Sequence, residues 1–517
     1  MRKGMKLGAK VLSVVMAGLT VTSMAACGGG GVDDSETNLV INFYSAGYGE
    51  NGFKALETAF ETKYPEYTVT LLADSGLINA NVEATLTAGP KINPVDLYFC
   101  GDLNIWSLIE KGANVVQGYD CVFEDLTSLY NTTVDGQKYK DKMLPYFEEY
   151  HNYNGKYYST SWATGINGLA YNAAYFEKEG WEIPVTTKEL EELIVKMKGK
   201  GYVPFVWPGG VGYWSYVTQA WWAQYAGEEQ IADFYQGIDM YGERSADCFY
   251  TPAFYETYKA LEMCISEEAN SYVGSISLDH LKSQNYFYLD SNKICMMPTG
   301  SWLETEMAEN GTRNVRMMRA PILSSVLKNT NADGSTYDRF ETVKDETTLR
   351  AVVKAIDRGE SGYTGVSVDD FATIKKMRSY VTTTSNLLQA VVPSYANAKP
   401  IALKFLEFMA TDEAMQLFYD ACGTYSPFNA KNLDFSNATA FNKDVLEGTQ
   451  DVTFLSLNFS KNKLFYATEL DYQVFVPELY IGSQSEADKK DAMEFFEFNY
   501  GSIRDKWHIY LQLAGIE

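Results

Sequence analysis

The chain has 517 residues, which is enough for two domains, or for two lobes of one fold, with large apolar cores. Its formal net charge of −24 disfavours binding to phosphate backbones, so we expect no nucleic acid partner. The three histidines, His151, His280 and His508, are not at metal-ligand spacing, and the sequence contains no phosphate-binding loop, dinucleotide fingerprint, EF-hand loop or G-x-S-x-G motif. We therefore expect no metal and no cofactor, and no catalytic motif indicates an enzyme.

Residues 1–26 have the order of a secretory signal peptide. A basic head is followed by an apolar stretch from Val11 to Met24 and by two alanines at a cleavage site. Cys27 stands at that site, and the arrangement resembles a bacterial lipobox, in which the cysteine is acylated and becomes the mature N-terminus. The alternative is an ordinary signal peptide followed by a chance cysteine. Residues 27–37 then predict a flexible, polar tether.

No later stretch is apolar for long enough to span a bilayer. We therefore expect a protein that is anchored by lipid at the extracellular face of a bacterial cell membrane. Six cysteines remain after Cys27, and their spacings match no disulfide framework. We expect them to be buried as small apolar side chains, and whether any of them pair stays open.

From residue 38 onward, strands and helices alternate. Residues 39–44, 67–71 and 95–99 predict three strands, and residues 52–63 and 79–87 predict the helices between them. This order predicts a parallel sheet in an α/β fold.

Ligands of such sheets bind beyond the carboxyl ends of the strands. Tyr48 lies in the loop after the first predicted strand, and Asp102 lies in the loop after the third. Both are therefore candidate ligand contacts, and a carboxylate such as Asp102 makes strong hydrogen bonds to hydroxyl groups. The alternative for Asp102 is a turn residue that caps the following helix.

The later elements are predicted by helix caps and by short apolar runs. They are an extended stretch at 157–172, a helix after the capping box Thr186-x-x-Glu189, a strand at 293–297, a polar surface turn at 329–338, a helix that opens at Pro400, and a helix capped by Thr411 that ends at Gly423.

Aromatic side chains are abundant, with 38 Tyr, 27 Phe and 9 Trp. Their rings have apolar faces, which suit the apolar face of a pyranose ring. For any single ring, packing in the core is the alternative. One group is concentrated in a short stretch, and its members are Trp207, Tyr213, Trp214, Tyr216, Trp221 and Trp222.

Four segments, in this order along the chain, resemble the extracellular solute-binding proteins of ABC transporters, in the sugar-binding group that includes maltose-binding protein. The most specific segment is Asn154-Gly155-Lys156-Tyr157-Tyr158, which continues through Gly168-Leu169-Ala170-Tyr171-Asn172 to Glu189-Leu190. The other three are Phe53 to Pro65, Asn292 to Trp302, and Val392 to Pro427. The stretch 324–367 is longer than is usual in this family, and the segment after residue 430 has no motif of the family.

The resemblance implies two α/β lobes joined by hinge crossovers, with the ligand in the cleft between the lobes. The first lobe would be residues 38–145 plus 298–390, and the second would be 146–297 plus 391–517. The crossovers would lie near Tyr146, Met297 and Leu388.

The resemblance also implies a set of ligand-binding residues and a function. Trp302 begins the helix after a crossover, where family members place a stacking aromatic, and the remaining candidates are Trp214, Trp162, Thr164, Trp207, Tyr48 and Asp102. The protein would be a monomer that captures an extracellular carbohydrate, an oligosaccharide, and delivers it to the permease subunits of an ABC transporter. The alternatives are a lipid-anchored glycoside hydrolase, which needs a pair of carboxylates, and a carbohydrate-binding surface protein without a role in transport.

Overall fold

The computed structural model describes residues 35–77, 79–89, 91–111, 116, 118–266, 268–311, 313–331, 334–384, 388–456, 462–468, 470, 476–485 and 487–516. The predicted signal peptide, Cys27 and most of the predicted tether lie outside these residues. Within the described part, no helix has the length and apolar character needed to cross a bilayer.

The first sheet has the strand order β2-β1-β3-β16-β8. Its strands are β1 (Asn38–Tyr44), β2 (Thr68–Asp74), β3 (Leu97–Phe99), β8 (Thr160–Ser161) and β16 (Gln389–Val391). β1 is parallel to β2 and β3, as the alternation of strands and helices predicts. β16 is antiparallel to both β3 and β8, so a strand from late in the chain completes this sheet.

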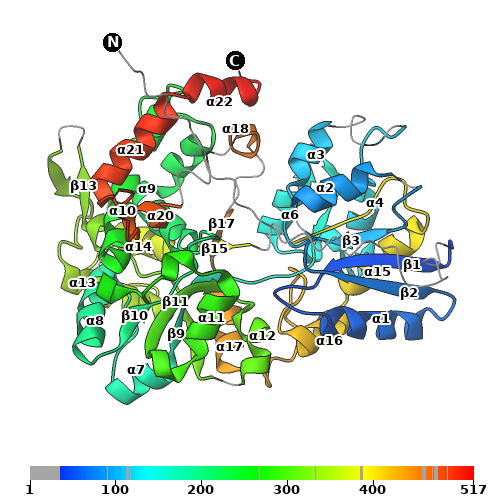
Figure 1. Cartoon of the computed structure of the whole chain (residues 1–517), viewed down its shortest axis with the longest axis horizontal. Coiled ribbons are helices and arrows are strands. Elements are labelled where there is room, and N and C mark those ends of the chain that lie inside the picture. Colours follow the sequence, from blue (N-terminus) through cyan, green and yellow to red (C-terminus); the bar gives the residue numbers. More distant parts are fainter. Residues whose placement is uncertain are drawn as a thin grey trace, which may run out of the picture. The chain divides into compact units, whose positions relative to one another are not determined.

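Helices cover both faces of the first sheet (Figure 1). They are α1 (Asn51–Lys63), α2 (Asn79–Thr87), α3 (Ile105–Lys111), α4 (Thr127–Tyr130), α5 (Tyr139–Lys142), α6 (Pro145–His151), α15 (Lys399–Met409) and α16 (Asp412–Cys422). The apolar stripe of α1 buries Phe53, Leu56 and Phe60 against α15 and α16, and Phe60 lies 5.1 Å from the ring of Phe405. The opposite face carries α2 and α3, whose buried side chains form a separate cluster with Val40.

The second sheet has the order β10-β11-β9-β15-β17, and a further strand, β12, pairs with β9. Its strands are β9 (Asn167–Asn172), β10 (Val203–Phe205), β11 (Ile294–Gly300), β12 (Val315–Met318), β15 (Tyr380–Thr383) and β17 (Thr453–Ser456). β9 is antiparallel to β11, β12 and β15. Three short hairpins lie outside the two sheets: β4 (Thr133–Val134) with β5 (Gln137–Lys138), β6 (Asn152–Tyr153) with β7 (Lys156–Tyr157), and β13 (Lys328–Thr330) with β14 (Thr336–Asp338).

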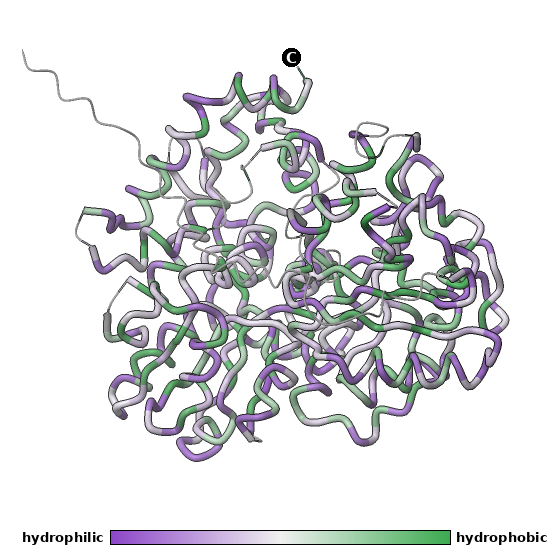
Figure 2. The backbone as a smooth tube through the Cα atoms, turned by 45° about the vertical axis from the view of Figure 1, so that its right-hand side comes forward, coloured by the Kyte–Doolittle hydropathy of each residue, from purple (hydrophilic) through white to green (hydrophobic). Residues whose placement is uncertain are grey.

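The helices around the second sheet are α7 (Ala173–Glu179), α8 (Thr187–Gly199), α9 (Ser215–Tyr235), α10 (Pro252–Ile265), α11 (His280–Tyr288), α12 (Leu303–Glu306), α13 (Glu346–Asp357), α14 (Val368–Ser379), α17 (Ala440–Gly448), α18 (Lys463–Tyr466), α20 (Glu478–Ile481), α21 (Ala492–Arg504) and α22 (Trp507–Leu513). Most of these helices contribute to one large apolar cluster, whereas α11, α12 and α17 contribute Phe287, Leu303 and Phe441 to the cluster that also contains residues of α1. Hydrophobic and hydrophilic stretches follow one another along the helical turns of the backbone tube (Figure 2), which is the pattern of helices that bury one face.

Local caps begin and end several helices where the sequence predicts them. The Thr186 side chain accepts a hydrogen bond from the backbone N–H of Glu189, and Gly423 ends α16 in the left-handed conformation. The Glu189 carboxylate, however, accepts from the backbone N–H of Val185 at 2.8 Å, one residue before the position that a capping box requires.

Three segments connect the two sheets, and their described residues are 162–166, 384, 388 and 424–439. The segments are hydrogen-bonded to one another. Trp162 N–H donates to the Leu388 carbonyl at 3.0 Å, Thr164 N–H donates to the Tyr425 carbonyl at 2.8 Å, and the Thr383 hydroxyl donates to the Gly165 carbonyl at 2.9 Å. We call these three segments the hinge. Leu388, near which a crossover was predicted, directly precedes β16, whereas Tyr146 lies in α6 and Met297 lies inside β11, so the chain crosses at neither of these two positions.

Two long segments pack on a different sheet from the one that the sequence predicts. Residues 298–390 were expected in the first lobe, yet β12 and β15 belong to the second sheet, and α13 and α14 contribute Val352 and Ile374 to its core. Residues 391–430 were expected in the second lobe, yet α15 and α16 pack against α1. An apolar helix stripe shows that a helix is buried but not which of two sheets it covers.

Candidate functional site

Trp302 lies where the second sheet meets the loops of the first. It follows β11 directly and is partly exposed. A Cβ atom at Gly300 would lie 2.1 Å from the Trp302 ring, so only glycine allows the indole to fold back over the end of β11. The sequence Gly300-Ser301-Trp302 thus fixes the position of the ring.

Two tyrosines complete an aromatic cluster around this indole. The ring centroids of Tyr213 and Tyr216 lie 6.0 and 5.9 Å from that of Trp302, at 70° and 79°, and 4.9 Å from each other. Both tyrosines come from the start of α9 and are 8% exposed. We call Trp302, Tyr213 and Tyr216 the aromatic cluster.

The loop after β1 contacts the aromatic cluster from the side of the first sheet. The backbone N–H of Gly47 donates to Glu306 Oε1 at 3.1 Å, and Gln284 Nε2 donates to Glu306 Oε2 at 2.7 Å. Burial raises the pKa of the Glu306 carboxyl, and its hydrogen bonds with Gln284 and Gly47 oppose that rise. Glu306 therefore joins a loop of the first sheet to two helices of the second.

Asp102 occupies the loop after β3, as predicted, and lies near this carboxylate. A Cβ atom at Gly101 would lie 2.4 Å from the ring of Tyr44, so the absence of a side chain at Gly101 lets the ring pack on the backbone beside Asp102. Burial raises the pKa of Tyr44, and the negative charges of Glu306 and Asp102 raise it further.

The Asp102 side chain contacts solvent, yet the protein atoms crowded around its carboxyl raise its pKa by partial desolvation. The site therefore offers aromatic faces and hydrogen-bond acceptors within one region, which is the combination that binds hydroxylated rings.

Tyr48 is brought to the same region, but its side chain is 5% exposed. Its hydroxyl forms a hydrogen bond of 2.9 Å with the hydroxyl of Ser301, and burial raises its pKa to about 12. Because the side chain is buried and its hydroxyl is bonded to Ser301, Tyr48 positions the loop after β1 against Ser301.

Trp162 and Thr164 belong to the hinge, which corrects their prediction as ligand contacts. Trp162 is 1% exposed, its ring lies 5.4 Å from that of Phe53, and its indole N–H donates to the Cys100 carbonyl at 2.8 Å. Thr164 is 5% exposed, and its carbonyl accepts from the Thr424 hydroxyl at 2.7 Å. Sequence spacing places both residues between the sheets but does not show that the hinge fills this space.

Trp214 and Trp207 also lie away from the aromatic cluster. Trp214 is fully buried with its ring 5.3 Å from that of Phe205, because the residue between Tyr213 and Ser215 points to the opposite side of the helix start. Trp207 is 2% exposed, and its indole N–H donates to the Ser271 hydroxyl at 3.0 Å. The edge of Trp207 lines a separate pocket, which is considered below.

Sequence reasoning did not single out Tyr44, Gln284 or Glu306, and after Gly212 it selected Trp214, which the structure buries, in place of Tyr213 and Tyr216. Tyr213 and Tyr216 are three residues apart at a helix start, a spacing that puts both on one face. That spacing was a usable signal. No comparable signal marks Glu306, since the pairing with Gly47 joins residues that are distant in the sequence.

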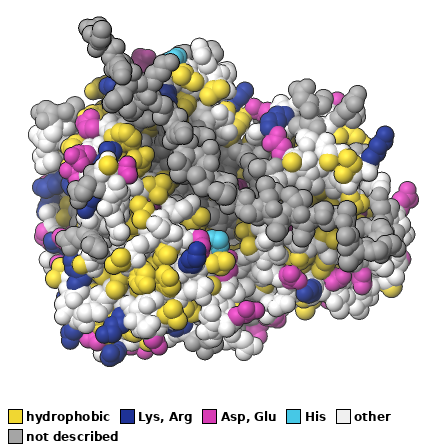
Figure 3. Space-filling model, in the orientation of Figure 1, with side chains coloured by type: hydrophobic (Ala, Val, Ile, Leu, Met, Phe, Trp, Pro, Cys, Tyr) yellow, Lys and Arg dark blue, Asp and Glu magenta, His cyan; other side chains and the backbone are white. Residues whose placement is uncertain are grey.

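Within the described ranges, no group of three His, Cys, Asp or Glu side chains is placed to hold a metal ion. Five of the six described cysteines are buried, and Cys121 is partly exposed. On the face drawn in Figure 3, acidic and basic side chains are interspersed.

Comparisons with known proteins show what this chain is similar to. No family model matches the chain. By sequence it is similar to the diacetylchitobiose binding protein NgcE of Streptomyces coelicolor, with 21% identity over 271 residues that cover 51% of this chain. The match covers 55% of the length of that relative, which is about half.

Two solved structures resemble the structure over most of its length. The solute-binding protein RafE in complex with raffinose has a TM-score of 0.60 at 14% identity, over 90% of this chain and 99% of RafE. The GacH receptor of Streptomyces glaucescens, solved unliganded and with acarbose, has a TM-score of 0.59 at 14% identity, over 93% of this chain and 99% of GacH. The chain thus has the fold of solute-binding proteins, and the predicted two-lobed α/β fold is confirmed.

Proposed function

We propose that the protein captures an extracellular carbohydrate, an oligosaccharide, at the aromatic cluster and delivers it to the permease of an ABC transporter. The observation that carries the proposal is the arrangement of Trp302, Tyr213 and Tyr216 beside two carboxylates, at the meeting point of two sheets that a hydrogen-bonded hinge connects. Asp102 and Glu306 supply the carboxylates.

Each part of this arrangement has a role in binding sugar. The indole of Trp302 offers an apolar face to a pyranose ring, and the carboxylate of Asp102 accepts hydrogen bonds from the hydroxyl groups at its rim. A carboxylate in a partly desolvated recess makes stronger hydrogen bonds than one in bulk water. The relatives support this class of ligand, because their names and titles describe binding of diacetylchitobiose, raffinose and acarbose.

We also propose where the lobes divide and how they move. The first lobe is residues 35–161 plus 389–423, and the second is 167–383 plus 440–516, with the hinge between them. Ligand that contacts both lobes favours the closed arrangement, as in hinge-bending binding proteins. The hydrogen bonds from Gly47 to Glu306 and between Tyr48 and Ser301 hold the lobes together beside the site.

The cellular setting is part of the same proposal. Cys27 carries the lipid that anchors the protein at the extracellular face of the membrane, and the acidic tether holds a monomeric body at a distance from it. The permease subunits recognise the closed form. Binding at the site requires no catalytic step, so the bound sugar is released intact.

The experiment is a thermal-shift screen of the purified protein against neutral oligosaccharides of differing linkage and length, followed by calorimetry on each positive ligand. A ligand should bind with a Kd of about 1 μM or tighter, about −8 kcal/mol, and should raise the melting temperature by mass action. Sugar recovered after prolonged incubation should be chemically intact. Shorter products would favour a glycoside hydrolase, and a screen without any positive sugar would refute the proposed ligand class.

A further inference from the structure

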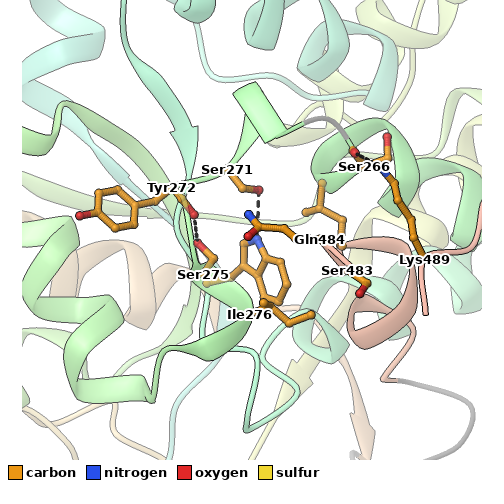
Figure 4. Close-up of a pocket in the computed structure, with 11 residues that line it drawn as sticks. Ser266, Ser271, Tyr272, Ser275, Ile276, Ser483, Gln484 and Lys489 are labelled. Atoms are coloured by element: carbon orange, nitrogen blue, oxygen red, sulfur yellow. Dashed lines mark hydrogen bonds between the residues drawn. The ribbon is translucent and has the colours of Figure 1, made fainter. Parts of the chain in front are cut away.

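A second pocket lies in the helical layer beside the second sheet, away from the aromatic cluster. It has a volume of about 310 Å³ and is lined by residues from the ends of β10 and α10, from the segment 271–276 and from the segment that follows α20. Ligand pockets have volumes of roughly 300–1,000 Å³, so this one is large enough for a small organic molecule. In Figure 4, Ser271 and Ser275 line one side, and Ser266, Ser483 and Lys489 line the other.

The hydroxyl groups of this pocket are arranged to donate hydrogen bonds. The oxygen of Ser271 already accepts from the indole N–H of Trp207 at 3.0 Å, and the oxygen of Ser483 accepts from the backbone N–H of Ser485 at 3.2 Å. A hydroxyl whose oxygen accepts one bond still carries a proton to donate. Neither proton has a partner among the described residues, so both are available to a ligand that accepts hydrogen bonds.

The charge of the lining points the same way. None of the eleven lining residues is acidic, although Asp and Glu outnumber Lys and Arg by 67 to 43 in the chain. Lys489 is exposed, and its ammonium group donates to the Ser266 carbonyl at 3.2 Å, which leaves two of its three protons for other acceptors. Gln484 adds an amide group on the exposed side of the pocket.

We infer that this pocket binds an oxyanion group, a carboxylate or a phosphate, of a small organic molecule about the size of a hexose. Lys489 supplies the charge, the Ser271 and Ser483 hydroxyl groups supply neutral donors, and the edge of Trp207 supplies an apolar wall. Hydrogen bonds to an ionised group are roughly twice as strong as neutral ones, which favours an anion over a neutral sugar in this lining. This site is independent of the proposed sugar site, because Tyr213 and Trp302 do not line it.

Calorimetry of the purified protein tests the inference with four probes: glucuronate, glucose 6-phosphate, inorganic phosphate and glucose. Glucuronate or glucose 6-phosphate should bind saturably, and glucose should not bind at this pocket. Binding of glucuronate alone or of glucose 6-phosphate alone supports the inference and identifies the oxyanion. Failure of both, or equal binding of glucose, overturns it.

Variants distinguish binding of the anion in the pocket from an effect of the net charge of the protein. Lys489→Gln and Ser483→Ala should each weaken the anion by about tenfold, the loss expected for one charge-assisted hydrogen bond. Lys489→Arg should retain most of the affinity. The matched control is Lys490→Gln, which makes the same change of charge at the next residue, where the ammonium lies 4.8 Å from the centroid of the Phe498 ring.

An equal loss in the Lys490→Gln variant would overturn the inference, because it would show an effect of net charge alone. A competition experiment locates the binding. Saturation of the protein with a neutral oligosaccharide found in the first screen should leave the affinity for the anion unchanged, whereas displacement of the anion would place it at the aromatic cluster and overturn the inference.

Discussion

Replacement of Trp302 by alanine should separate ligand binding from folding stability. The Trp302 side chain is partly exposed, and the ring centroids of Tyr213 and Tyr216 lie 6.0 and 5.9 Å from its own. Removal of the indole should therefore cost the free protein little packing. Truncation of an aromatic anchor at a binding surface commonly costs about 2 kcal/mol or more, which is about thirtyfold in Kd. Calorimetry with the best oligosaccharide of the screen measures this loss, and urea unfolding measures the stability.

Trp162→Ala is the matched control for Trp302→Ala. The Trp162 ring is 1% exposed and lies among Phe53, Phe99 and Phe418, at 5.4, 6.3 and 6.3 Å. Truncation of a buried aromatic ring costs roughly 3–5 kcal/mol of folding free energy. This variant should therefore lose stability on that scale, while the fraction that stays folded should bind the oligosaccharide with nearly the parent affinity.

The opposite pattern would refute this assignment of the two tryptophans. If Trp302→Ala binds like the parent protein, the aromatic cluster is not the sugar site. If Trp162→Ala stays stable and loses affinity, the ring that the structure places in the core is the one that contacts the ligand.

Three further predictions concern a buried acid, the anchor and the motion of the lobes. Burial raises the pKa of Glu478 from 4.5 to about 8, so the folded protein keeps a proton that the unfolded chain releases, and the free energy of unfolding should fall as the pH rises from 4.5 to 8. Glu478→Gln should remove that part of the fall in urea titrations at several pH values, and an unchanged slope would contradict the role of this carboxyl. Cys27→Ser should release the protein from the membrane fraction or leave it unprocessed, and a cleaved variant that stays membrane-bound would exclude the lipid anchor. Small-angle scattering should show a smaller radius of gyration at saturating ligand, whereas identical curves at proven occupancy would count against closure of the lobes.

The elements of the first sheet are predictable because each one is specified locally. Three such features are the alternation of strands and helices from residue 38 to residue 99, the helix cap at Thr186 and the helix end at Gly423. Each depends on neighbouring residues, and the structure has each of them. The division into lobes is less predictable. The same apolar stripe would let α15 cover either sheet, and only the fit of Phe405 against Phe60 and Phe99 decides between them.

The site shows the same division between local and distant information. The strand-end rule places Tyr48 and Asp102 correctly in their loops, and the resemblance places Trp302 at the end of β11. Burial decides the rest. Tryptophans at 162 and 214 suit a sugar site as well as the one at 302 does by residue type alone, and only the packing around each ring shows which of them remains accessible.

The position of β16 between β3 and β8 in the first sheet affects the order in which the chain folds. Its residues 389–391 fill the space between β3 and β8, both of which come much earlier in the chain. Until β16 is synthesised, β3 has an unpaired edge and β8 has no partner strand in the first sheet, and α15 and α16 are not yet present to cover α1. Contacts between such distant residues slow folding, because a long loop must close before they form. The first sheet and the helices α15 and α16 can therefore be completed only after residues 389–422 have been synthesised.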